Sequence, residues 1–92
     1  MRDNEFEWDD RKAASNIRDH GLTFEAAREA FDDPNWFDTE DPDPDEERYN
    51  RLCILQGEVI VVTYTERLPR IRIISARRAN RHEQRQYFDQ QA

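Results

Sequence analysis

Arginines dominate the last part of the sequence, and their spacing points to the binding of phosphate groups. Residues 67–85 contain seven arginines and one acidic residue. A guanidinium group donates hydrogen bonds as a planar fork that fits phosphate oxygens, and it keeps its charge near neutral pH. In the segment 70–76, RIRIISA, strand alternation would place Arg70 and Arg72 on one face. Together with Arg67 in the preceding turn, these residues predict a basic strip on a sheet.

A final helix over residues 77–90 is predicted to extend this basic surface. Arg77 and Arg78 would open the helix, and Glu83 and Tyr87 are four residues apart on one of its faces. A carboxylate and a phenol beside arginines could take part in proton transfer. The alternative is that the glutamate pairs with a local arginine and that the tyrosine closes the core.

A second group of polar residues lies on a helix predicted over residues 11–20. Lys12, Asn16 and His20 are spaced by four residues and therefore share one stripe of this helix. Histidine exchanges a proton near neutral pH, which makes His20 a second candidate for acid or base chemistry. At the carboxyl end of a helix, however, an imidazole also bonds to the last carbonyl groups, and this structural role stays open.

No residue pattern predicts a metal ion or another cofactor. The single cysteine, Cys53, can form neither an internal disulfide nor a cysteine-based metal site. The acidic loop, residues 41–47 (DPDPDEE), has enough carboxylates for Ca²⁺ or Mg²⁺, but it lacks the glycine that an EF-hand loop needs. A solvated loop broken by prolines is the simpler interpretation. Glycine-rich phosphate loops and serine-nucleophile motifs are absent from the sequence.

Charge is distributed unevenly along the chain of 92 residues. Residues 1–47 hold 17 acidic and 5 basic side chains, whereas residues 48–92 hold 4 acidic and 9 basic ones. The net charge of -7 argues against a nucleic acid as partner of the chain taken as a whole. The basic second half nevertheless fits an anionic ligand on one part of the surface. The alternative is that the arginines pair with the acidic half.

Hydrophobic periodicity predicts one α+β domain over residues 1–92. The predicted elements are a strand at 6–8, helices at 11–20 and 24–32, strands at 36–40, 48–55, 58–66 and 70–76, and a helix at 77–90. Tight turns between the late strands favour a mostly antiparallel sheet of three to five strands, with two amino-terminal helices and one carboxyl-terminal helix. Without an apolar membrane span or a secretory signal, a soluble cytoplasmic protein is expected.

Two stretches of the chain resemble the BrnT family of toxins from type II toxin–antitoxin modules. EFEWDDRKAASNIRDHGLTFEAAREAFDDP and RIRIISARRANRHEQRQY contain the motifs F-x-W-D-x-x-K-x-x-x-N, H-G-x-x-F, F-x-D-P and R-I-I-S-A-R. The resemblance, over residues 5–87, implies a RelE-like fold and an RNA-cutting toxin. It also implies inhibition by a ribbon–helix–helix antitoxin of the BrnA type, with operator DNA bound only by the complex. The family's motif positions are Lys12, Asn16, His20, Glu47, Arg48, Arg67, Arg72, Arg77, Glu83 and Tyr87.

If the chain cleaves RNA, no metal ion is required. A base would take the proton of a ribose 2′-hydroxyl, and the oxyanion would attack the adjacent phosphate. Arginines would stabilise the developing charge, Glu83 or His20 would be the base or acid, and Tyr87 would orient the RNA. The expected catalytic residues are Arg67, Arg72, Arg77, Glu83, His20 and Tyr87. The residues expected to bind RNA are Lys12, Arg48, Arg70, Arg78 and Arg81.

Two other interpretations of the sequence stand beside that of a nuclease. In the first, the arginines bind an acidic segment of an antitoxin, and the pair represses transcription without any catalysis. In the second, the chain is a degenerate toxin that has kept its fold. Two departures from the family pattern bear on this: Asp19 stands where members often carry lysine, and the acidic loop is unusually rich in carboxylates. The chain also has only 18 Leu, Ile, Val and Phe residues, which fits marginal stability without a partner.

Overall fold

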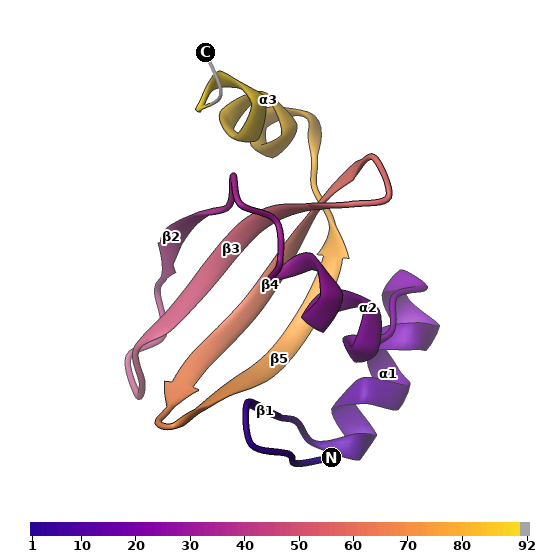
Figure 1. The fold of residues 1–92 in the computed structure, drawn as a ribbon, viewed down its shortest axis with the longest axis vertical. Coiled ribbons are helices and arrows are strands. Elements are labelled where there is room, and N and C mark those ends of the chain that lie inside the picture. Colours follow the sequence, from indigo (N-terminus) through magenta and orange to yellow (C-terminus); the bar gives the residue numbers. More distant parts are fainter. Residues whose placement is uncertain (91–92) are drawn as a thin grey trace.

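Residues 1–90, which the computed structural model describes, form an α+β fold on a five-stranded sheet (Figure 1). The elements are β1 (Phe6–Glu7), α1 (Asp10–His20), α2 (Phe24–Ala30), β2 (Phe37–Asp41), β3 (Arg48–Leu55), β4 (Glu58–Arg67), β5 (Arg70–Arg78) and α3 (Arg81–Asp89). The sheet order is β1-β5-β4-β3-β2, in which β1 runs parallel to β5 and the other neighbours are antiparallel. The predicted fold class is confirmed. No helix in the described part of the chain is long and apolar enough to cross a membrane.

Local hydrogen bonds set the starts of the first two helices, and α2 ends at Ala30, two residues before its predicted end. Asp9 caps α1 by accepting from the backbone N–H groups of Arg11 and Lys12 at 2.8 and 3.0 Å. The helix stops at Gly21, whose φ of 69° lies in the left-handed region that favours glycine. Thr23 then caps α2 through its hydroxyl oxygen. The two helices are therefore separated by a short, sharply defined turn.

The final helix begins at Arg81, later than the sequence pattern predicts. The side chain of Asn80 accepts the N–H of Glu83, and the side chain of Glu83 accepts the N–H of Asn80. This reciprocal capping box sets the helix start. Arg77 and Arg78 instead continue β5 and pair with β4. The prediction that they open the helix is wrong, because the capping box follows them.

The helices pack on opposite faces of the sheet. α1 and α2 cover one face, where Phe24, Ile60 and Ile73 are fully buried. α3 covers one end of the other face through Tyr87, and Ala79, which precedes the helix, is buried in the same cluster. Figure 1 shows α3 at the end of the sheet away from β1 and the amino terminus. The rest of that second face is available for polar side chains.

An extra residue in β5 decides which side chains share the open face. The pairing register shifts between Thr63 and Tyr64 of β4, which leaves Ile74 of β5 as a β-bulge. Strict alternation would turn Arg72 and Arg77 to opposite faces, because an odd number of positions separates them. The bulge reverses this outcome, so both arginines lie on the open face.

Asn16 fastens α1 to β5 beside this bulge. Its amide nitrogen donates to the carbonyl oxygens of Leu22 and Ala76 at 2.9 and 2.8 Å, and its Oδ1 accepts the Ala76 N–H at 3.0 Å. β1 pairs with β5 at Ile71 and Arg72, so Ala76 lies beyond the end of this pairing. The Asn16 side chain therefore satisfies both backbone groups of Ala76 in place of a neighbouring strand.

We expect Asn16→Ala to lower the free energy of unfolding by about 3 kcal/mol, because it leaves three buried backbone groups without this partner. Ser15→Ala is the matched control in the same helix, since the Ser15 hydroxyl forms an exposed bond to the carbonyl of Arg11. Its expected effect is below about 0.5 kcal/mol. Urea unfolding followed by circular dichroism measures both values. Equal losses in the two variants would contradict the role given to Asn16.

Candidate functional site

The open face of the sheet carries the arginines of the last two strands. The register places Arg72 opposite Thr65 and Arg70 opposite Arg67, and the bulge adds Arg77 to the same side. These four arginines, Arg67, Arg70, Arg72 and Arg77, are termed the arginine face. The predicted strip of Arg70 and Arg72 on one side of a strand is thus confirmed.

Two arginines of this face are held firmly by glutamates from other elements. The Nη1 of Arg72 lies 2.6 Å from Oε2 of Glu7 in β1. Arg77 binds Glu83 of α3 through two parallel contacts of 2.8 and 2.9 Å. A fork of this kind restricts the rotation of the guanidinium group as well as its position. Arg72 and Arg77 are therefore oriented before any ligand arrives.

The other two arginines make single contacts. Nη2 of Arg67 lies 3.3 Å from Oε2 of Glu46 in the acidic loop. Nε of Arg70 donates to the backbone carbonyl of Asp3 at 2.6 Å. The alternative interpretation of the charge asymmetry, pairing between the two halves of the chain, is therefore confirmed for Arg67 and for Arg72.

These pairs leave the guanidinium groups open to solvent. The side chains of Arg67, Arg77 and Arg72 are 52%, 40% and 28% exposed. The glutamates that face Arg72 and Arg77 are more buried, each with 16% of its side-chain surface exposed. The pair of Arg67 with Glu46 is more open to water, which screens such pairs to at most about 1 kcal/mol. The arrangement orients the arginines and still leaves them accessible to an anion.

Glu83 is the carboxylate best placed to accept a proton at this face. The hydrogen bond from Arg77 lowers the pKa of Glu83, partial burial opposes that effect, and the backbone N–H of Asn80 lowers the pKa further. Glu83 is therefore charged at neutral pH and fixed beside the guanidinium group of Arg77. A ligand on Arg77 would present its hydroxyl groups to this carboxylate.

Tyr87 points into the core and away from the arginine face. It is 2% exposed, and its hydroxyl donates to Oδ2 of Asp33 at 2.6 Å. Burial and then the hydrogen bond to Asp33 raise the pKa of Tyr87. The alternative interpretation of the final helix is confirmed, since Tyr87 closes the core and Glu83 pairs with a local arginine.

His20 and Arg78 lie on the helix-packed side of the sheet. Nη1 of Arg78 donates to the carbonyl of His20 at 3.0 Å, and its Nε lies 3.0 Å from Glu58. Arg78 pairs in register with Ile60, whose side chain packs under α1 and α2. Lys12 is exposed on α1 itself. The structure therefore does not bring these three basic residues to the arginine face.

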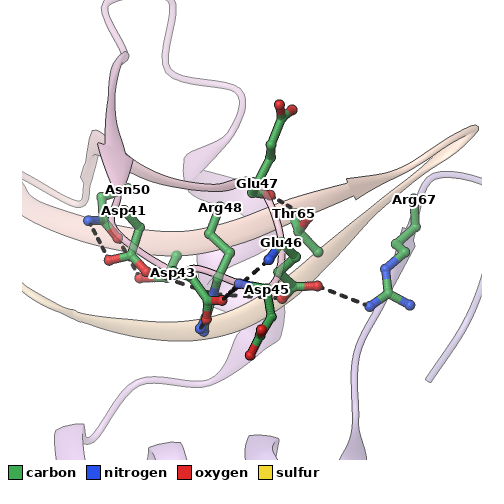
Figure 2. A network of polar contacts seen from close by, with 10 residues as sticks. Asp41, Asp43, Asp45, Glu46, Glu47, Arg48, Asn50, Thr65 and Arg67 are labelled. Atoms are coloured by element: carbon green, nitrogen blue, oxygen red, sulfur yellow. Dashed lines mark hydrogen bonds and ion pairs between the residues drawn. The ribbon is translucent and has the colours of Figure 1, made fainter.

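Arg48 is the first residue of β3 and lies beside the acidic loop that connects β2 and β3 (Figure 2). Its Nη1 is 2.5 Å from Asp43, and its Nε is 3.8 Å from both Asp41 and Glu46. These three carboxylates are partly exposed, and Asp45 and Glu47 of the same loop are exposed. Arg81, by contrast, is exposed at the start of α3.

Sequence reasoning missed two carboxylates at the arginine face, Glu7 and Glu46. Glu7 alternates with the buried Phe6 and Trp8, and this alternation alone predicts that Glu7 lies on the opposite face of the strand. What sets it against Arg72, however, is the parallel pairing of β1 with β5. Glu46 lies in a loop, and no periodicity describes the path of a loop.

The fold and this face define a small α+β protein with a group of oriented arginines on the open face of its sheet. The model of the family described as the ribonuclease toxin BrnT of type II toxin–antitoxin systems matches residues 8–83. The chain belongs to this family, as its motifs predict. It is therefore a ribonuclease toxin, with RNA as its substrate and an antitoxin as its partner. The comparison with curated proteins finds no match.

We expect Tyr87→Phe to lower the free energy of unfolding by about 2 kcal/mol, because Asp33 loses a hydrogen bond inside the core. RNA cleavage per folded molecule should stay unchanged. Tyr49→Phe is the control, since the Tyr49 hydroxyl makes only a long, exposed contact of 3.5 Å to Glu47 among those described. Urea unfolding and a cleavage assay well below the unfolding midpoint provide the two readouts. Lost cleavage in a fully folded Tyr87→Phe variant would place Tyr87 in the reaction.

Proposed function

We propose that RNA is cut on the arginine face, where Arg72 and Arg77 bind the scissile phosphate and Glu83 is the general base. One observation carries this proposal: the bulge turns both arginines to one side, and Glu83 grips one of them through two contacts. A phosphate that takes the place of this carboxylate on Arg77 stays next to it. In this proposal, Glu83 and the scissile phosphate are adjacent as soon as the RNA binds.

The proposed reaction uses the neighbouring 2′-hydroxyl of the RNA as nucleophile. Glu83 accepts the proton of this hydroxyl, and the oxygen attacks the adjacent phosphorus. The bond to the 5′ oxygen of the next nucleotide breaks, and that oxygen takes a proton from water. The products are a 2′,3′-cyclic phosphate and a free 5′-hydroxyl. Arg72 and Arg77 balance the charge that grows on the phosphate oxygens, so the reaction proceeds without a metal ion.

The remaining arginines of the face bind the RNA backbone on either side of the cut. Arg67 and Arg70 lie next to the turn between β4 and β5 and extend the positive surface in that direction. Arg81 extends it along α3. The residues that receive no contact with the scissile phosphate in this proposal are Lys12, His20, Arg48, Arg78 and Tyr87.

Arg72→Ala and Arg77→Ala are each expected to reduce RNA cleavage at least about 100-fold, the loss typical of one donor to a developing charge. Both side chains are partly exposed, so the variants should remain folded by circular dichroism. Arg85→Ala removes the same charge from an exposed position of α3 and should cleave normally. Purified proteins are incubated with RNA in EDTA, and the products are separated on gels.

Three results would each overturn one part of this assignment. Full cleavage by the folded Arg72→Ala and Arg77→Ala variants would remove these arginines from the reaction. Loss of cleavage by the unchanged chain in EDTA, restored by a divalent cation, would remove the metal-independent step. A 5′-phosphate in place of a 5′-hydroxyl on the product would exclude the 2′-hydroxyl as nucleophile.

We infer that the antitoxin is a ribbon–helix–helix protein of the BrnA type and that operator DNA is bound only by the complex. The single arginine face supports this division, because an antitoxin that covers these arginines leaves contacts to DNA phosphates to itself. An acidic segment of the antitoxin on the arginine face would block RNA by competing for the same guanidinium groups.

Saturating antitoxin is expected to raise the melting temperature of the toxin. At a concentration of about 100 times Kd, binding to the folded state adds about 2.7 kcal/mol to the free energy of unfolding. In a domain of this size that corresponds to a shift of about 10 °C or more. The shift should shrink in Arg72→Ala if the arginine face is covered. An unchanged melting temperature in differential scanning fluorimetry would contradict the interaction.

A further inference from the structure

The acidic loop closes one end of the arginine face. Glu46 reaches from this loop to Arg67, and the hydroxyl of Thr65 donates to the carbonyl of Glu47 at 2.7 Å (Figure 2). Thr65 stands opposite Arg72 in the register, so this contact brings the loop onto the open side of the sheet. Carboxylates of residues 41–47 therefore lie beside the proposed RNA surface.

The loop is held in this position by several polar contacts. Arg48, at the start of β3, binds Asp43 and approaches Asp41. The backbone N–H of Asp45 and then the Arg48 guanidinium lower the pKa of Asp43, so this carboxylate stays charged well into acid. Asn50 of β3 donates to Asp41 at 3.2 Å, which ties the loop to the sheet. The acidic groups thus have fixed places beside the face.

Glu46 differs from the other glutamates at the face in how it holds its arginine. Its contact with Arg67 is 3.3 Å long, against 2.6 Å for Glu7 with Arg72, and the side chains of Glu46 and Arg67 are partly exposed, at 34% and 52%. Its other carboxylate oxygen faces Arg48 at 3.8 Å. A hollow of about 280 Å³ beside this contact is lined by Glu46, Glu47, Tyr49, Thr65, Glu66 and Arg67. Glu46 thus holds its arginine more loosely than Glu7 and Glu83 hold theirs.

We propose that Glu46 is a built-in competitor of RNA at Arg67 and that the acidic loop limits RNA affinity at this end of the face. The RNA backbone then runs over β5 and β1, and it gains Arg67 only by displacing Glu46. This inference rests on the proposed function, because it assumes that RNA binds the arginine face. It names the group that RNA must displace and the arginine that is gained.

The test compares two substitutions that change the net charge equally. Glu46→Gln removes the carboxylate from Arg67. Glu40→Gln removes an exposed carboxylate from the opposite, helix-packed side of the sheet. The register shows this side, because Glu40 pairs with Tyr49 and Tyr49 pairs with Tyr64, which contacts Phe31. Binding of a fluorescent single-stranded 2′-O-methyl RNA, which lacks the nucleophile and stays uncut, is followed by anisotropy. Glu46→Gln should tighten binding about three- to fivefold, the range of one exposed ion pair. Glu40→Gln should change it much less, because salt screens distant charges.

The salt dependence adds a readout that counts phosphate contacts. One additional contact should steepen the slope of log K against log salt by about 0.7 for a single strand. This steepening is expected for Glu46→Gln, and Arg67→Ala in the same chain should abolish both the steepening and the gain in affinity. Glu46→Ala provides a second removal of the carboxylate, and thermal unfolding of every variant identifies those that are folded.

The outcomes separate this inference from the proposed function. If RNA binding depends on Arg72 but Glu46→Gln and Glu40→Gln change the affinity equally, Glu46 does not compete with RNA, although RNA still binds the arginine face. A gain in RNA affinity that persists in the Arg67→Ala background would also refute the role of Glu46. If Arg72→Ala and Arg77→Ala leave RNA binding unchanged, the proposed function itself fails.

Discussion

The bulge at Ile74 in β5 is the constraint on which the open face depends. Without it, the odd spacing between Arg72 and Arg77 would direct one guanidinium under α1 and α2, into a core that contains Phe24. A charge buried there without a partner would be very costly. Asn16 holds the backbone of β5 directly after the bulge. The same short stretch therefore fixes the docking of α1 and the chemistry of the opposite face.

The carboxylates around the arginine face occupy its guanidinium groups, which lowers the affinity of these groups for another anion, and they also fix the orientation of the arginine side chains. Guanidinium groups on adjacent strands repel one another, and Glu7 and Glu83 reduce that repulsion while they fix the side-chain rotamers. In the proposed function, an incoming phosphate would meet donors that are already placed, and it would displace the two carboxylates from them. Displacement at Arg77 has a second effect. It removes the main hydrogen bond that lowers the pKa of Glu83, so phosphate binding itself would make this carboxylate a stronger base.

Local interactions made the elements of the fold predictable, whereas contacts between distant segments did not show in the sequence. β3 has its predicted bounds, Arg48–Leu55, because alternation and flanking turns are local signals. A bulge depends on the partner strand, so nothing near Ile74 marks it as the extra residue. The arginine strip was predicted for the same reason as β3. Its partner Glu7 was not, since β1 and β5 meet only in the folded chain.

Net charge is a poor guide to what this molecule binds. The chain carries a charge of -7, but salt largely screens exposed charges that are more than a Debye length of about 10 Å apart. The long axis of the molecule is 36 Å, so acidic residues at its far end are screened from the arginine face. The carboxylates in contact with this face are Glu7, Glu46 and Glu83. In the proposed function, a phosphate would compete with these three groups, and distant charges would contribute little to that competition.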